Sequence, residues 1–489
     1  MTGKPDDRKD RKKVNSRLKQ FKEKYGFLVF AFLLPLLIMW LVYIAIKVYP
    51  FGNNSVLVLD LNGQYVYFYE QLRQKLVEGG SLLYSWSRTL GGEFLGIIGY
   101  YVASPFAFLT VLFPKEHITE ALLLIILLKT GSMGATMAFY LNKVYPSKKI
   151  NVIIFSTCYA LSGYAVVQAH NSMWIDNLIL LPLVAYGIEQ LVSKRRFKLY
   201  TVTLALSLIT NFYIGYMMCL FCIVYFFYYY LSHDDGCEVN FYLETNHFWK
   251  SVGRMLVYSL IAIAISMIIV YPSYYSLQFG KTTFSTTKWS VGQNFDFLDL
   301  FVKFFPGSYD TVRPEGLPFV YCGIIAVMLL PVYFISSKIS SKERIAGGVV
   351  LGMFVLFFNT YAIDIVWHGF QRPNWLNYRY SFMFIFLILV MAYKGFCNLR
   401  NLSYKYVAVF GGVLIIILMF IQKQDYEFLD DQEAIWLSIA LIAAYLILLY
   451  SEHTSFNGRA KTIATSTVLL VVCLELFLSG LLNTLDLHD

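Results

Sequence analysis

Charged residues are scarce in this sequence, and their scarcity excludes a soluble globular protein. Only 15% of the 489 residues are charged and 57% are hydrophobic, whereas a soluble domain carries roughly 25% charged residues. Many apolar runs approach or exceed the roughly 20 residues with which a helix crosses a bilayer. The sequence therefore predicts an all-α, polytopic integral membrane protein.

The sequence also lacks the short motifs of common enzyme and metal sites. It contains no GxSxG, no HExxH and no P-loop, so nothing in it supports a hydrolase or an ATPase. Cys219 and Cys222 form a CxxC within a hydrophobic run, with no second pair and no nearby histidine. We interpret them as packing residues and not as a metal or redox site. No internal repeat is recognisable, which weakens the case for a transporter.

The positive charge is concentrated partly at the start of the chain. The net charge is +9, and residues 1–25 include the runs KPDDRKDRKK and RLKQFKEK. A basic tail ahead of a span is far more often a cytoplasmic topology anchor, attracted to anionic lipid, than a nucleic-acid-binding arm. No small-residue cleavage site follows the first span, so we expect a retained anchor.

About thirteen transmembrane helices follow from the apolar runs. The predicted spans are 26–47, 118–141, 150–168, 174–192, 199–211, 213–231, 252–277, 317–336, 345–363, 380–398, 404–421, 434–450 and 461–482. Residues 94–113 are apolar enough to span, but the positive-inside rule favours a re-entrant or interfacial segment with a break at Ser104-Pro105. The run 199–231 is too long for one span and short for two, so we expect broken helices around Asn211.

The stretch 56–92 directly follows the first span and carries an acidic residue, Asp60, close to the membrane surface. Behind it, apolar residues recur at three- and four-residue steps: Tyr65, Phe68, Tyr69, Leu72, Leu76 and Val77. This spacing predicts an amphipathic helix that lies in the bilayer interface. Such an arrangement suits a membrane enzyme whose substrate has its tail in lipid. The alternative is that Asp60 only caps the following helix.

Further polar residues collect on the face that the predicted topology turns outward. They are Arg88, His170, Asn171, Trp174, Asp176, Asn211, Tyr213, Arg372 and Arg379. Glycosyl transfer from a lipid phosphate needs a base for the acceptor hydroxyl, and a carboxylate serves well. It also needs cations for the departing phosphate, which arginine binds with two parallel hydrogen bonds.

Asp60 as base, with Arg372 or Arg379 as phosphate clamp, would meet both needs. Each residue also has an ordinary alternative. Arg379 could snorkel to the headgroups, and Asp176 could cap the span after it. His170 has no second histidine at ligand spacing, which argues against a metal site.

Five blocks of the sequence resemble the YfhO family of bacterial membrane proteins. The blocks are LDLNGQYVYFYEQL, LGGEFLGIIGYYVASPFAFLTVLFP, CYALSGYAVVQAHNSMWIDNLILLPLVAYGIEQL, NFYIGYM and FQRPNWLNYRYSF. They run in order from about residue 56 to residue 382. That family resembles the GT-C superfamily of polyprenyl-phosphate-dependent glycosyltransferases, which have many spans and a long first external loop with interfacial helices.

The resemblance implies an activity and its partners. The donor would be a sugar on undecaprenyl phosphate at the outer leaflet. The acceptor would be a cell-envelope glycopolymer, with lipoteichoic acid the family's best-known case. Relatives of this type work downstream of a cytoplasmic enzyme that charges the lipid and a small flippase. The resemblance implies no certain cofactor. A divalent cation is possible, and metal dependence stays open because Asp60 has no neighbouring acid of the kind that some GT-C members carry.

The resemblance also implies site residues and a division of the chain. Asp60 would be the general base of an inverting displacement. Arg88, Arg372 and Arg379 would bind the donor phosphate, and substrate contacts would come from Gln64, Tyr65, His170, Asn171, Trp174, Asp176, Asn211 and Tyr213. The expected regions are a basic cytoplasmic tail (1–25), a GT-C-like catalytic transmembrane core (26–277) with an extracellular loop at 48–117, a second extracellular loop (278–316) and a C-terminal transmembrane region (317–489).

Two other classes of function compete with the enzyme. The aromatic-rich spans and broken helices would also suit a transporter or flippase of lipid-linked sugar, which would move its substrate without changing it. A non-catalytic scaffold for envelope assembly is the third hypothesis. In that case substitutions at Asp60, Arg372 and Arg379 would act only through stability.

Overall fold

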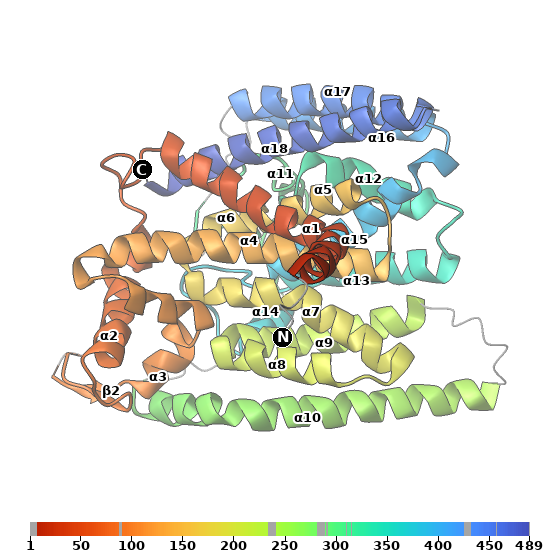
Figure 1. The fold of residues 1–489 in the computed structure, drawn as a ribbon. Helices are drawn as coiled ribbons and strands as arrows, with labels where there is room; N and C mark the ends of the chain where they lie inside the picture. Colours follow the sequence, from red (N-terminus) through yellow and green to blue (C-terminus); the bar gives the residue numbers. More distant parts are fainter. Residues whose placement is uncertain are drawn as a thin grey trace, which may run out of the picture.

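The protein is a bundle of helices with almost no sheet in its described part (Figure 1). The computed structural model describes residues 7–87, 90–232, 241–280, 289, 292–309, 311–313, 315–424, 432–455 and 457–488. Its helices of the bundle are α1 (Asp7–Ala45), α4 (Ile118–Val144), α5 (Lys149–Ala160), α6 (Gly163–Val167), α7 (Ser172–Lys194), α8 (Lys198–Thr210), α9 (Phe212–Ser232), α10 (Phe241–Gly280), α12 (Ile324–Ile335), α13 (Ser341–Asn359), α14 (Tyr361–Trp367), α15 (Ser381–Cys397), α16 (Lys405–Gln424), α17 (Gln432–Thr454) and α18 (Gly458–His488). A short helix, α11 (Asp299–Val302), lies in the second long loop.

Length and apolar composition make this a multi-pass membrane protein. Eight helices among the described residues are long and apolar enough to cross a membrane, or up to ten if each bent pair of helices is one span. The predicted number of about thirteen is therefore not confirmed. Three of the predicted spans correspond to the shorter apolar helices α8, α12 and α15.

The centre and the rim of the bundle differ sharply in burial. In α15, every side chain from Ser381 to Phe396 is buried. In contrast, only 17% of the apolar window of α10 is buried. Figure 1 shows α10 along one edge of the molecule and α16 and α17 along the opposite edge. An apolar helix that leaves most of its surface outside the protein is suited to face lipid.

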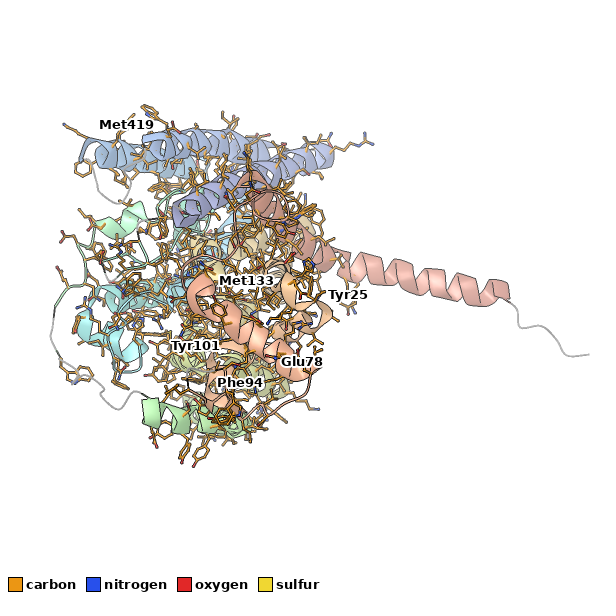
Figure 2. All side chains as sticks on the ribbon, turned by 90° about the vertical axis from the view of Figure 1, so that its left-hand side faces the viewer. Tyr25, Glu78, Phe94, Tyr101, Met133 and Met419 are labelled. Atoms are coloured by element: carbon orange, nitrogen blue, oxygen red, sulfur yellow. The ribbon has the colours of Figure 1, made fainter. Side chains whose placement is uncertain are left out.

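The first long loop forms a layer across one end of the bundle. It contains η1 (Leu61–Tyr65), α2 (Val66–Val77), a hairpin of β1 (Tyr84–Ser85) and β2 (Gly92–Glu93), and α3 (Leu95–Ile97). In Figure 1, α2 runs across the ends of the long helices, and Figure 2 views the molecule from this side, with Glu78, Phe94 and Tyr101 labelled.

The amphipathic helix expected in this loop is confirmed as α2. Val66, Tyr69 and Leu72 form its buried stripe, and Leu76 and Val77 at its end are exposed. The periodicity of the apolar residues was therefore sufficient to identify the helix, and its position in the bilayer interface stays a prediction.

Both predicted breaks in the apolar runs are present. The segments Leu95–Val102 and Pro105–Leu112 are bent by 98°, and the Ser104 side chain accepts a hydrogen bond from the Phe106 amide at the break. At Asn211, α8 ends and α9 begins. The Asn211 Oδ1 atom accepts the Ile214 amide at 2.8 Å, which satisfies a free donor in the first turn of α9.

Two predicted spans are wrong in their extent. Residues 317–323 are buried but not helical, because Gly323 has a φ of +95° and the Ile324 amide donates to a side chain of α18, Glu475 Oε1, at 2.6 Å. The run 345–363 is divided at Thr360 into α13 and α14. Hydropathy does not show the coil at 317–323, which is apolar, whereas the division of 345–363 coincides with two polar residues, Asn359 and Thr360.

Candidate functional site

Asp60 lies at the start of η1, with its side chain exposed and bound to Tyr65. It makes no capping hydrogen bond to the helix that follows, so the interpretation of Asp60 as a cap is wrong. The Tyr65 hydroxyl lies 3.1 Å from Asp60 Oδ2 and 3.1 Å from Asn171 Oδ1, and it can donate to either oxygen. Burial raises the pKa of Tyr65, and the Asp60 carboxylate raises it further. Tyr65 therefore stays a hydrogen-bond donor at neutral pH.

Asn171 connects Tyr65 to a buried polar turn before α7. Its Nδ2 atom lies 2.8 Å from Gln168 Oε1 and 2.8 Å from His170 Nε2. The His170 Nδ1 atom lies 2.8 Å from the Val167 carbonyl, so Nδ1 carries the proton and Nε2 accepts. This network fixes the Asn171 amide with its oxygen toward Tyr65.

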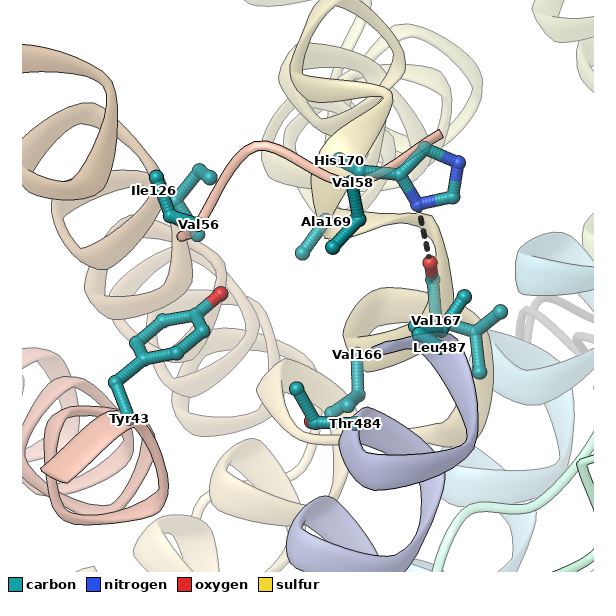
Figure 3. Close-up of a pocket in the computed structure, with 10 residues that line it drawn as sticks. All are labelled: Tyr43, Val56, Val58, Ile126, Val166, Val167, Ala169, His170, Thr484 and Leu487. Atoms are coloured by element: carbon teal, nitrogen blue, oxygen red, sulfur yellow. Dashed lines mark hydrogen bonds between the residues drawn. The ribbon is translucent and has the colours of Figure 1, made fainter. Parts of the chain in front are cut away.

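A small cavity lies behind this turn (Figure 3). It has about 20 Å³ of room for water between Tyr43, Val58 and His170, which is enough for one or two water molecules. The ring of Tyr43 points toward it in Figure 3. The cavity is too small for a sugar, so it is not the binding site of the substrate.

Arg379 supplies the positive charge of the site. Its guanidinium carbon lies 4.8 Å from the ring centre of Trp174 and 5.1 Å from that of Tyr213, both within cation–π range. Its Nε donates to the Leu376 carbonyl at 2.9 Å and its Nη2 to the Trp375 carbonyl at 3.1 Å. The guanidinium packs against these rings and carbonyls of the protein, and does not extend away from the chain as a snorkelling arginine would.

No carboxylate pairs with Arg379 among the described residues. Its Nη1 atom makes no hydrogen bond within that part of the chain either. The two charged groups of the site are connected by the turn before α7. Tyr65 lies 3.1 Å from both Asp60 and Asn171, and Trp174, whose amide donates to the Asn171 carbonyl at 2.8 Å, packs on Arg379. A guanidinium without a carboxylate partner is suited to bind an anion.

The backbone is strained next to both charged residues. Leu59, which precedes Asp60, has a φ of +48°. Phe370, Leu376 and Tyr378, in the loop that leads to Arg379, have φ values of +66°, +61° and +52°. Such conformations are costly for residues other than glycine, and they cluster at functional sites.

Asp176 and Asn211 hold the first loop against the bundle. Asp176 lies inside α7 and does not cap it; its carboxylate accepts from Lys129 Nζ at 2.7 Å and from the Ser104 hydroxyl at 2.8 Å. The Asn211 Nδ2 atom donates to the Tyr100 carbonyl at 2.8 Å. The two residues thus fix the bent segment on either side of its break.

Two of the other residues predicted for the site, Gln64 and Arg372, are exposed on the surface. Gln64 is exposed on η1, and Arg372 is exposed with its guanidinium 5.3 Å from the ring of Tyr361. Arg88 lies outside the described residues. Trp174 is buried, and its Nε1 has no hydrogen-bond partner in the described part of the chain.

Three contributors were missed by the sequence analysis. Lys129 stands alone in an apolar run, and a lone charge at membrane depth is a signal that could have identified it. Tyr164 donates to the Arg379 carbonyl at 2.8 Å, and the Tyr100 carbonyl accepts the hydrogen bond from Asn211. Nothing in the sequence distinguishes these two from the other tyrosines.

No cluster of three or more His, Cys, Asp or Glu side chains within the described residues could hold a metal ion. A divalent cation would have to take ligands from the substrate or from residues outside that part. The cluster thus offers an exposed carboxylate, a tyrosine that stays protonated and a guanidinium open to an anion. Together these groups can remove a proton from a hydroxyl and bind a phosphate.

The sequence matches a known family along most of its length. The family described as "Bacterial membrane protein YfhO" matches residues 31–487. A curated relative is "Uncharacterized protein YfhO" of Bacillus subtilis (strain 168), 24% identical over 413 residues that cover 80% of this chain and 44% of that protein. The chain thus spans less than half the length of this relative.

Two solved structures are similar to this chain at a low level. ArnT from Cupriavidus metallidurans in the apo state matches with a TM-score of 0.49 and 14% identity, covering 95% of this chain and 77% of that one. The same protein bound to undecaprenyl phosphate matches with a TM-score of 0.47 and 12% identity over the same shares. Scores below 0.5 do not establish a common fold.

Proposed function

Because the chain belongs to the YfhO family of bacterial membrane proteins, we propose that it is a membrane glycosyltransferase. It moves a sugar from an undecaprenyl-phosphate-linked donor to a cell-envelope glycopolymer, lipoteichoic acid or a related teichoic acid or wall polysaccharide, on the extracellular face. The resemblance of the YfhO family to the GT-C superfamily supports the reaction type. The site supports the chemistry.

The observation that carries the proposal is that the turn before α7 connects Asp60 to Arg379, through Tyr65 and Asn171 on one side and Trp174 on the other. Asp60 is an exposed carboxylate in the loop after the first span. Arg379 is a guanidinium with no carboxylate partner in the described part of the chain, held between two aromatic rings. A base and an anion-binding group held by the same turn of the chain supply the two functions that transfer from a phosphate donor requires.

In this proposal Asp60 takes the proton of the acceptor hydroxyl as the oxygen attacks the anomeric carbon of the sugar. A new carbon–oxygen bond forms while the bond from the anomeric carbon to the phosphate oxygen breaks. The lipid phosphate leaves toward Arg379, which neutralises its charge. A single displacement with one carboxylate inverts the anomeric centre. The Tyr65 hydroxyl orients the carboxylate.

The two parts of this site come from different regions of the chain. Asp60 and the turn at Asn171 belong to the proposed catalytic core at 26–277, and Arg379 belongs to the C-terminal transmembrane region at 317–489. The C-terminal region therefore completes the site in this proposal. The lipid tail of the donor would lie beside α2, whose apolar residues end in an exposed pair, Leu76 and Val77.

The decisive test compares envelope polymers from cells with the wild-type protein, cells without it, and cells with Asp60→Asn. Attached sugar is measured by mass spectrometry and protein level by immunoblot. We expect Asp60→Asn to match the deletion at normal protein level, because an amide cannot take the proton. Asn62→Asp provides a control that adds an acid two residues away and leaves Asp60 in place.

Full decoration in the Asp60→Asn strain would remove Asp60 from the mechanism and favour a transporter or scaffold. A transporter would be identified by reconstituting the protein in liposomes. Movement of lipid-linked sugar without transfer to an acceptor would contradict the enzyme.

A further inference from the structure

We call the Arg379 guanidinium and the rings of Trp174 and Tyr213 that pack on it the Arg379 cage. A buried pair of an aspartate and a histidine near this cage has no role in the proposed reaction. Asp364 and His368 lie one turn apart on and just after α14, and both are buried. The His368 Nδ1 atom lies 3.3 Å from Asp364 Oδ1 and 2.9 Å from the Asp364 carbonyl. His368 Nδ1 therefore carries a proton directed at Asp364.

The pair reaches the Arg379 cage along two routes. The Tyr380 hydroxyl donates to Asp364 Oδ1 at 2.9 Å, and Tyr380 is the residue after Arg379 in the chain. The Tyr213 hydroxyl lies 3.4 Å from the His368 carbonyl, and the ring of Tyr213 is one face of the cage. Both the guanidinium and one of its aromatic walls are thus tied to the same small pair.

Tyr380 is held on its other sides by aromatic packing. Its ring stacks on Trp367 with 4.5 Å between centroids and on Phe358 with 5.2 Å, and His368 meets it edge-on at 5.7 Å. The hydrogen bond from the Tyr380 hydroxyl to Asp364 restrains the remaining motion of the ring. Because Tyr378 and Leu376 have left-handed backbones just before Arg379, this loop needs such an anchor to hold its conformation.

The pair is not optimised for stability alone. His368 Nε2 is buried and has no hydrogen-bond partner in the described part of the chain. An apolar side chain in its place would leave no unsatisfied nitrogen. A buried polar group retained at such a cost suggests a positioning role.

We propose that Asp364, acting through Tyr380 and His368, is the positioning residue that holds the Arg379 cage in the arrangement that binds a lipid-linked phosphate. This inference rests on the proposed function, since it needs a phosphate ligand at Arg379. Asp364 and His368 do not touch the ligand. They hold the Arg379 guanidinium and the ring of Tyr213 in the positions from which these groups bind the phosphate.

The test measures binding of undecaprenyl phosphate to the purified full chain in detergent, with undecaprenol as the probe without phosphate. The variants are Tyr380→Phe, Asp364→Asn and His368→Asn. The control is Tyr404→Phe, which also removes one tyrosine hydroxyl that donates a hydrogen bond, here from the residue before α16 to the Leu446 carbonyl of α17. We expect Tyr380→Phe to weaken phosphate binding about 3- to 10-fold, as loss of one hydrogen bond would. Binding of undecaprenol and the thermal midpoint should follow the Tyr404→Phe control.

The asparagine variant of His368 separates positioning from direct contact. Asparagine places an N–H near the position of Nδ1 and has nothing at Nε2, so positioning predicts binding close to wild type. Loss equal to that of Arg379→Ala would mean that Nε2 meets the ligand, which overturns the inference. Equal binding by wild type and Tyr380→Phe would also overturn it. If the wild type itself fails to prefer undecaprenyl phosphate over undecaprenol, the proposed function fails instead.

Discussion

Tyr65 is the residue that binds the Asp60 carboxylate of the site. It binds Asp60 and Asn171 through one hydroxyl, and its pKa is raised by burial and by Asp60. A group whose pKa is raised on folding contributes stability that is present below its unfolded value and is lost as pH rises above it. That unfolded value is 10.0, so Tyr65 does not limit activity or stability at neutral pH.

We expect Tyr65→Phe to lower sugar transfer about 3- to 10-fold, because it removes one hydrogen bond that orients the base. Attached sugar per protein molecule is the measurement. Tyr67→Phe is the matched control, since Tyr67 is exposed two residues away on α2. Equal activity of the two variants would contradict an orienting role for Tyr65.

Two substitutions of Arg379 distinguish the contribution of its positive charge to phosphate binding from that of its planar shape. Lysine keeps the charge but loses the planar fork. We therefore expect Arg379→Lys to weaken lipid-phosphate binding about 10- to 100-fold, the range for charge-assisted hydrogen bonds, and Arg379→Ala to weaken it further. Arg372→Ala should change binding little, because Arg372 is exposed against Tyr361. An equal loss in both arginine-to-alanine variants would favour a clamp made by the pair.

The sequence nominated Arg372 and Arg379 equally, and only the fold separates them. Arg379 differs because Trp174 of α7 and Tyr213 of α9 pack on it. Asp60 could be found from its position after a span, but the contact of its partner Tyr65 with Asn171 joins residues 106 positions apart in the chain. Contacts of that kind have no periodicity in a single sequence, so they could not be predicted.

Among the elements, the bent segment from Leu95 to Leu112 depends on a buried ion pair. Lys129 of α4 and Asp176 of α7 meet at 2.7 Å with side chains 1% and 4% exposed, and Ser104 adds a hydrogen bond at the bend. Removing one partner of a buried pair leaves an uncompensated charge, whereas removing both can be nearly neutral.

We therefore expect Lys129→Met to destabilise the protein by about 3–5 kcal/mol and the double variant Lys129→Met/Asp176→Leu to recover much of the loss. Thermal unfolding in detergent, followed by tryptophan fluorescence, gives both values. A single variant as stable as the wild type would show that Asp176 is neutralised in another way. A double variant that is stable but transfers no sugar would show that the Lys129–Asp176 pair is needed for activity and not only for stability.

Helix boundaries were predicted well where composition changes and poorly where it does not. The basic and polar flanks of α4 and α7 are visible in the sequence. The apolar coil at 317–323 is not, because its deviation from a helix depends on one glycine and on Glu475 of a distant helix.

For the whole molecule, the side on which the site lies follows from charge. We predict that the Asp60 loop faces outward and the loop near Lys338 faces the cytoplasm, since Lys338, Lys342 and Arg344 follow a span. In a cysteine-free background, Asn53→Cys should react with a membrane-impermeant maleimide on intact cells, and Ser337→Cys only after permeabilisation. Labelling in the reverse order would place the site in the cytoplasm and exclude an extracellular polymer as acceptor.

The glycine pair after α2 suggests how the protein could be divided. Gly79 and Gly80 are exposed, and each has a positive φ. A cut between them would leave Asp60 and Arg379 on two separate polypeptides. The first would still be held by α1 against α4 and α18 and by α2 against α4. Association of the fragments would therefore not require the peptide bond, and two genes could together encode one site.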